Sequence, residues 1–207
     1  MEQRSGHVKS DPETWRRHVS TPLAVAVLAV SCALILLVRV YVFHPVYILE
    51  HSMEPTLHSG DRCFSVNIRM YPRGVDRGDI VSLRDPRGQG FELTKRIIGL
   101  PGEIFSVADG QVFINGQPLH EPYTSEALRI IVPPLRIPEG HVMALGDNRN
   151  HSEDSLVWGP VPMALIRSKV AFQFWPLAQV RSLAPESTAS RNPGARVQTP
   201  SRLSINR

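Results

Sequence analysis

Residues 52–57 read S-M-E-P-T-L and begin only a few positions after a long apolar run. Residues 23–38 carry no charge, Arg39 interrupts the run, and residues 40–43 continue it. About 20 helical residues span a hydrocarbon core of ~30 Å, so the run can cross a membrane if Arg39 snorkels to the interface. We therefore predict one transmembrane helix over residues 22–43, in contact with membrane lipid, with a separate domain behind it.

A cleaved signal peptide and a buried core helix are the alternatives to this anchor. A charged start followed by an apolar run is typical of signal peptides. However, residues 39–45 read R-V-Y-V-F-H-P and contain no small-x-small cleavage site, which favours an uncleaved anchor. Four basic residues precede the run, and few follow it closely: Arg4, Lys9, Arg16 and Arg17. The positive-inside rule then predicts that residues 1–21 are cytoplasmic and that the rest lies outside the plasma membrane.

Beyond the anchor, apolar and polar residues alternate with a period of two, as in strands with one buried face. The residues expected on buried faces are Phe64, Val66 and Ile68 in one stretch and Val170, Phe172 and Phe174 in another. Asp109-Gly110 and Asn115-Gly116 are hairpin turn signals that flank the short run 111–114, and residues 104–108 precede them. We therefore expect residues 44–183 to be mainly antiparallel β-sheet.

The composition argues against several classes of function. The 207 residues carry a net charge of +4, but much of the basic excess lies at the two ends of the chain, which disfavours nucleic-acid binding. The histidines show no metal-ligand spacing, so we expect no metal or other cofactor. Cys32 lies inside the apolar run and Cys63 beyond it, so we expect two free thiols. Residues 184–207 are rich in Ser, Thr, Pro, Asn and Arg and are expected to be a disordered tail.

Residues 91–98 read F-E-L-T-K-R-I-I, and strand alternation puts Lys95 on the apolar face. That face also holds Phe91, Leu93 and Ile97. Desolvation of an ammonium lowers its pKa, so the neutral amine could take the hydroxyl proton of Ser52. His51 is adjacent to the serine and points to the opposite face in an extended segment. The alternation alone does not decide whether Lys95 is a catalytic base, because a lysine that snorkels from a core strand would show the same pattern.

Three segments together resemble the active-site boxes of type I signal peptidases, which are membrane-bound Ser/Lys proteases. They are residues 52–57, residues 94–103 (T-K-R-I-I-G-L-P-G-E) and residues 146–155 (G-D-N-R-N-H-S-E-D-S). Three boxes in the right order are far more specific than any one of them. The resemblance implies an antiparallel β protease domain behind one membrane helix. It also implies cleavage of N-terminal signal peptides from exported preproteins through an acyl-enzyme.

The resemblance implies a role for each residue of the boxes. Ser52 is then the nucleophile, with its backbone N–H in the oxyanion hole, and Lys95 is the general base. Ser152 orients the lysine amine, and Asp154 supports the site from behind it. Asp147 and Asn148 belong to the same box as turn residues.

Relatives bind their substrate as an added β-strand, which here would lie between residues 47–50 and 93–95. Shallow apolar pockets near the serine would admit alanine at the first and third positions before the cleavage site. The residues expected to line this site are Ile48, Glu50, Met53, Leu93 and Thr94. The apolar ones could equally be core residues.

Two positions depart from the family pattern. Glu50 stands where many relatives have a small residue or serine beside the oxyanion, and Leu156 stands where they most often have an arginine paired with the aspartate. Neither change removes the dyad. A membrane-anchored domain that binds exported chains without cutting them therefore stays open. A self-cleaving Ser/Lys repressor would need a helix-turn-helix ahead of the protease domain, and a Ser/His/Asp hydrolase a G-x-S-x-G around the serine.

Overall fold

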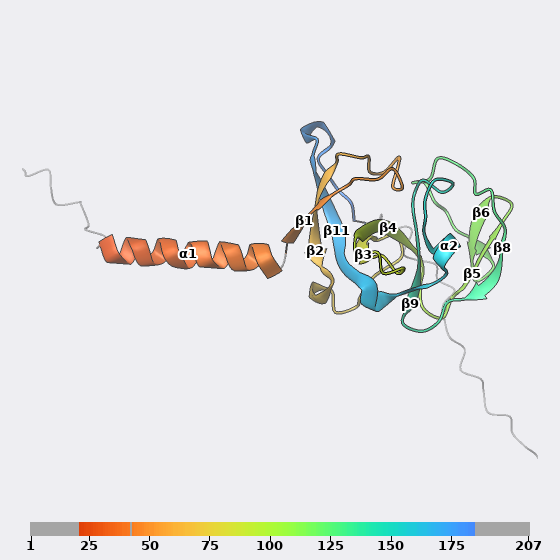
Figure 1. The fold of residues 1–207 in the computed structure, drawn as a ribbon, viewed down its shortest axis with the longest axis horizontal. Helices are drawn as coiled ribbons and strands as arrows, with labels where there is room; N and C mark the ends of the chain where they lie inside the picture. Colours follow the sequence, from red (N-terminus) through yellow and green to blue (C-terminus); the bar gives the residue numbers. More distant parts are fainter. Residues whose placement is uncertain (1–20, 42, 185–207) are drawn as a thin grey trace, which may run out of the picture. The chain divides into compact units, whose positions relative to one another are not determined.

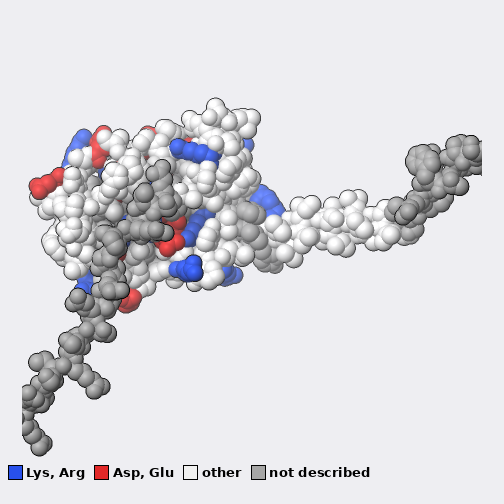
Figure 2. All heavy atoms as spheres, turned by 180° about the vertical axis from the view of Figure 1, so that it is seen from behind, with Lys and Arg blue, Asp and Glu red and all other residues white. Residues whose placement is uncertain are grey.

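The computed structural model describes residues 21–41 and 43–184. The predicted cytoplasmic segment and the predicted disordered tail therefore lie almost entirely outside the described residues. Helix α1 (Thr21–Tyr41) is long and apolar enough to cross a membrane, and its surface is uncharged along nearly its whole length (Figure 2). It ends two residues before the predicted boundary, because Phe43 already begins strand β1. Pro45 accounts for this, since the residue before a proline avoids helical backbone angles.

The rest of the described chain forms a unit of its own, separate from the helix, and consists of two antiparallel sheets (Figure 1). In order across the larger sheet the strands are β1 (Phe43–Tyr47), β2 (Arg62–Asn67), β11 (Ile166–Trp175), β3 (Ile80–Arg84), β4 (Glu92–Gly99), β9 (His141–Leu145) and β10 (Val161–Pro162), with β12 (Arg181–Ser182) on β11. The smaller sheet runs β7 (Gln117–Pro118), β6 (Gln111–Ile114), β5 (Ile104–Ala108) and β8 (Val132–Arg136). The mainly β prediction is confirmed.

Helical turns in this unit are short. They are α2 (Ser155–Trp158) and the 3-10 turns η1 (Ile68–Met70), η2 (Met163–Leu165) and η3 (Leu177–Gln179). None is long enough for a helical period to show in the sequence.

The predicted hairpin is confirmed residue by residue. Strands β5 and β6 pair antiparallel with Ala108 opposite Gln111, so Asp109 and Gly110 alone form the turn. Both turn residues have positive φ, 49° and 77°, as the two-residue turn that suits twisted strands requires.

The predicted buried face of β2 is wrong. Cys63 and Ser65 are fully buried, whereas Phe64 and Val66 are only half-buried. Phe64 instead stacks on Phe174, with 4.3 Å between the ring centroids. Both cysteines are free, as expected, and burial raises the pKa of the Cys63 thiol to about 12.

In β11 the predicted alternation holds only up to a bulge. The pairing with β2 shifts register between Val170 and Phe172 and again between Gln173 and Trp175. A bulge adds one residue to a strand and so inverts the faces that follow it. Val170 is therefore buried as predicted, Phe172 is exposed, and Gln173 is fully buried.

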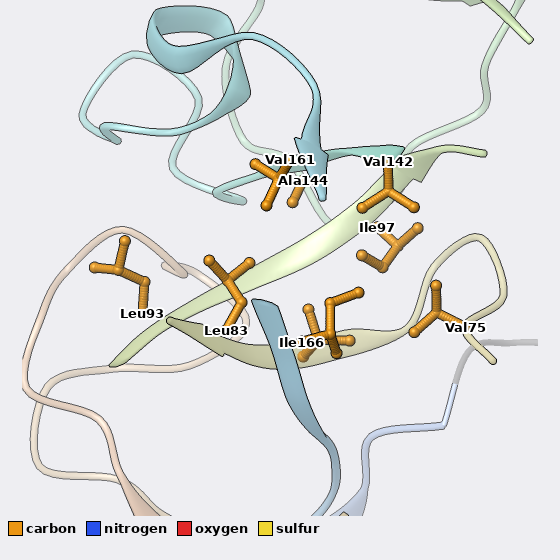
Figure 3. Packing of buried hydrophobic residues seen from close by; sticks show 9 residues of the cluster. Val75, Leu83, Leu93, Ile97, Val142, Ala144, Val161 and Ile166 are labelled. Atoms are coloured by element: carbon orange, nitrogen blue, oxygen red, sulfur yellow. The ribbon is translucent and has the colours of Figure 1, made fainter. Parts of the chain in front are cut away.

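Three clusters of buried apolar residues hold this unit together. The first lies on β3, β4, β9, β10 and β11, and its side chains point toward one another (Figure 3). It consists of Val75, Val81, Leu83, Leu93, Ile97, Val142, Ala144, Val161 and Ile166. The second joins the smaller sheet to β4 and β9 through Ile98, Met143 and Leu145. The third packs Met53 and Leu57 against the larger sheet and so holds the segment that carries Ser52.

Candidate active site

The segment that carries Ser52 is a tight turn anchored in the core. Met53 and Leu57 are buried, and the N–H of Leu57 donates to the carbonyl of Met53 at 2.9 Å. Full burial of one such side chain contributes roughly 1.5–3 kcal/mol. The carbonyl of Ser52 accepts a hydrogen bond from the N–H of Asn148 at 3.0 Å, and the Asn148 amide donates to the carbonyl of His51 at 3.1 Å. Asn148, predicted as a turn residue, thus also joins two of the three boxes.

Lys95 lies in the middle of β4 with 1% of its surface exposed. Its Nζ donates to Ser152 Oγ at 3.1 Å. Leu93 and Ile97 are buried on the predicted face, but Phe91 is exposed because it precedes the strand. Burial lowers the pKa of Lys95, so the neutral amine is favoured relative to a lysine in water.

Gly146 lies where the first and third boxes meet. A Cβ atom on Gly146 would lie 2.4 Å from the carbonyl oxygen of Ser52 and 2.3 Å from Ser152 Oγ. The close approach of both serines therefore requires glycine at this position. Ser52 itself is 8% exposed, and its hydroxyl makes no hydrogen bond within residues 21–41 and 43–184. The backbone of Ser52 and the side chain of Ser152 thus both pack against Gly146, and Lys95 bonds Ser152.

Asp154 is fully buried and is satisfied by the backbone. Its Oδ2 accepts from the N–H of Gly146 at 2.9 Å, and its Oδ1 accepts from the N–H of Leu156 at 3.0 Å, which caps α2. The carboxylate therefore holds the turn that carries Ser152. Leu156 in place of an arginine leaves it without a guanidinium but not without hydrogen bonds.

A buried ion pair that the sequence reasoning missed lies beneath the site. Arg96, which alternation puts on the face of β4 opposite to Lys95, is 6% exposed and binds Asp147 with two hydrogen bonds of 2.8 and 2.6 Å. Its Nη1 also donates to the carbonyl of Gly78, and its guanidinium lies 4.1 Å from the centre of the Tyr123 ring. The adjacent apolar residues at 97 and 98 were the available signal, because they require both faces of the strand to be buried.

A pocket of about 250 Å³ opens next to Ser52. Four of the predicted substrate-binding residues line it, namely Ile48, Glu50, Met53 and Thr94; the other lining residues are Tyr47, Leu49, Phe91 and Glu92. Leu93 does not, because it points to the opposite face of β4 and packs in the first core cluster (Figure 3). Strand β9 pairs with β4 only from Arg96 onward, so the first half of β4 has no strand on that side.

The residues that the structure describes contain no candidate metal site. Within residues 21–41 and 43–184, no three His, Cys, Asp or Glu side chains gather closely enough to hold an ion.

Comparisons with known proteins agree on one family. The family described as "Signal peptidase, peptidase S26" matches residues 21–175. A "Probable signal peptidase I-1" of Synechocystis sp. is 38% identical over 162 residues, 75% of this chain and 83% of that protein. A "Signal peptidase I" of Leptolyngbya laminosa is 35% identical over 185 residues, 85% and 91% of the two chains. The crystal structure of a signal peptidase I from Enterococcus faecalis V583 is 33% identical, with a TM-score of 0.40 over 47% of this chain and 97% of that one.

Proposed function

Because the chain belongs to the signal peptidase family, peptidase S26, it is a serine endopeptidase that cleaves signal peptides, and we propose that Ser52 and Lys95 perform the reaction. The burial of Lys95 together with its hydrogen bond to Ser152, which packs with the Ser52 backbone against Gly146, is the observation that supports this most strongly. A conventional Ser/His/Asp triad would need a histidine with a carboxylate behind it. His51 does pair with Glu54, but it does so at the exposed surface, and among the described residues neither side chain bonds the Ser52 hydroxyl.

The reaction begins with a proton transfer. Neutral Lys95 takes the proton of Ser52 Oγ as this oxygen attacks the carbonyl carbon of the scissile bond. Ser152 accepts a hydrogen bond from the amine, which leaves the nitrogen lone pair to face the nucleophile. The backbone N–H of Ser52 donates to the oxyanion that forms.

The second half of the reaction returns the proton. The lysine ammonium protonates the leaving amine, and the acyl-enzyme on Ser52 remains. The neutral amine then takes a proton from water, which attacks the ester and releases the cleaved signal peptide, and the ammonium returns that proton to Ser52 Oγ. Both attacks, by Ser52 and by water, start from neutral Lys95, so the rate falls as the pH drops below the pKa of the amine.

The substrate binds along the free half of β4. An extended peptide added between residues 47–50 and 93–95 would extend the sheet with backbone hydrogen bonds and place alternate side chains in the pocket. The pocket of about 250 Å³ is larger than one alanine side chain, so it has room for peptide backbone together with small side chains. Glu50 lies at its rim and is exposed, so its carboxylate can remain in water.

The substrates in this proposal are exported preproteins at the plasma membrane. Helix α1 is the anchor, residues 1–21 are cytoplasmic, and the β unit lies on the outer side, where signal peptides emerge. Proteolysis of intact spheroplasts checks this orientation. Added protease should degrade the β unit and spare a tag at the N-terminus.

The catalytic assignment is tested on the full chain in detergent with a precursor that carries an A-x-A cleavage site. Ser52→Ala and Lys95→Met should each lower cleavage by at least a thousandfold. Ser59→Ala is a matched control, because this exposed serine bonds only the Leu49 carbonyl at 3.2 Å, and it should keep wild-type activity. Near-normal cleavage by Lys95→Met would exclude the lysine as base.

A serine-directed acylating inhibitor distinguishes the enzyme from a domain that only binds exported chains. The wild-type chain should be labelled on Ser52, and Ser52→Ala should not be labelled. Absence of labelling in a folded wild-type chain would favour the binding domain.

A further inference from the structure

One arginine in the loop between β3 and β4 is firmly held by a buried carboxylate. Arg87 Nε donates to Asp85 Oδ1 at 3.1 Å, its Nη2 donates to Oδ2 at 3.2 Å, and its backbone N–H donates to Oδ1 at 2.9 Å. Asp85 is 1% exposed. A guanidinium bound by both oxygens of a carboxylate has a defined orientation, so the direction of its third nitrogen, Nη1, is defined as well.

Nη1 reaches the residue that follows Ser152 in the sequence. Arg87 Nη1 donates to Oε2 of Glu153, and the guanidinium carbon lies 5.3 Å from the centre of the Trp158 ring. A cation within about 6 Å of an indole face is attracted to it. Trp158 ends α2, whose N-cap is Asp154. The arginine thus contacts the active-site segment on both sides of Asp154.

The two charges of this ion pair act on Lys95 in opposite directions. Burial is the main cause of the lowered pKa of Lys95, and Arg87 lowers it further. The carboxylates of Asp154, Glu50 and Glu153 raise it. Because Glu153 is two-thirds exposed and next to Ser152, its charge would favour the ammonium if no cation offset it.

We propose that Arg87 is a positioning residue for the peptidase reaction. Through Glu153 and Trp158 it holds the segment that carries Ser152, the hydrogen-bond partner of the Lys95 amine. With the same ion pair it offsets the charge of Glu153. The inference rests on the proposed role of Lys95 as base. Arg87 and Glu153 do not line the pocket next to Ser52, so their effect is on the base and not on substrate binding.

The first test does not depend on turnover. The chain has three lysines, at positions 9, 95 and 169, so lysine labelled with ¹³C at Cε gives three resonances in the full chain in micelles. Lys95→Met identifies the signal of Lys95. Its titration midpoint should move to higher pH in Arg87→Gln, where Glu153 and Asp85 lose their cation. It should move to lower pH in Glu153→Gln, where the cation remains.

The double variant Arg87→Gln/Glu153→Gln should titrate near the midpoint of the wild-type chain, because both charges are gone. Arg129→Gln is the matched control. Arg129 is an exposed arginine that pairs with Glu126 at 3.5 Å, and its loss should leave the midpoint unchanged. Single variants that shift the midpoint in the same direction, or not at all, would overturn the proposal.

The second test uses cleavage of the A-x-A precursor. On the acidic side of the pH profile, kcat/KM should fall on the order of threefold in Arg87→Gln and rise by a similar factor in Glu153→Gln, with KM unchanged. Arg87→Lys keeps the charge but loses the bidentate hydrogen bonding to Asp85, so this variant should keep the pH profile and lose kcat at every pH. A change confined to KM, or full kcat in Arg87→Lys, would contradict positioning.

These results can be separated from a failure of the proposed function. If Lys95→Met still cleaves precursor, the lysine is not the base. The resonance of Lys95 still reports whether the ion pair controls its protonation.

Discussion

Replacing Gly146 with alanine should inactivate the enzyme far more than it unfolds it. The new Cβ would lie 2.4 Å from the Ser52 carbonyl oxygen and 2.3 Å from Ser152 Oγ, against about 3.4 Å for an ordinary contact. The Ser52 carbonyl and the Ser152 side chain must therefore each move by about 1 Å away from residue 146. Overpacking of this kind costs about 1–3 kcal/mol in stability. A misplacement of about 1 Å at reacting groups can cost ~10²-fold in rate.

Gly99→Ala provides the matched control. A Cβ at Gly99 would lie 2.4 Å from Cδ1 of Ile137, the far end of a side chain in the core of the smaller sheet. The shortest contacts are similar, but only the clash at Gly146 involves Ser52 and Ser152. Thermal unfolding and kcat for the A-x-A precursor are measured for both variants. The steric account is refuted if Gly146→Ala keeps kcat within a few-fold of the wild-type value, or if Gly99→Ala loses as much kcat as Gly146→Ala.

Two further outcomes are expected. Lys95→Met should raise the melting temperature of the chain. The pKa of Lys95 is lower in the folded than in the unfolded chain, so protonation of Lys95 opposes folding. The gain in melting temperature should therefore grow as the pH falls from alkaline values through that lowered pKa. A gain that shrinks with falling pH would contradict a desolvated lysine. Asp147→Asn should destabilise the fold by about 3–5 kcal/mol in denaturant titrations, because it leaves the buried guanidinium of Arg96 without its countercharge. A loss below about 1 kcal/mol would show that Arg96 finds another partner.

Local features of the fold could be predicted well. The hairpin of β5 and β6 depends on two adjacent residues, Asp109 and Gly110, that adopt positive φ at low cost, and its strands have the predicted bounds. The buried faces of β2 and β11 could not be predicted in the same way. A bulge after Val170 changes the phase of the alternation, and nothing in the local sequence marks it. Phe172 is exposed and Gln173 buried for this reason alone.

The site shows the same division. Three short boxes predicted Ser52, Lys95 and Ser152 as site residues, and alternation predicted that Leu93 and Lys95 share a face. It could not show that this face turns Leu93 away from the pocket, because that depends on which strand covers each side of β4.

The sequence by itself determined an anchor helix of membrane length, a mainly β domain and the residue types that a Ser/Lys peptidase needs. Only the tertiary structure decided which side chains meet. Lys95 and Ser152 are 57 positions apart, and Arg87 and Glu153 are 66 apart. Contacts over such separations depend on strand order, register and bulges, whereas local propensities act over a few residues. The proton affinity of the lysine is likewise a property of its surroundings, since burial and four nearby charges set it.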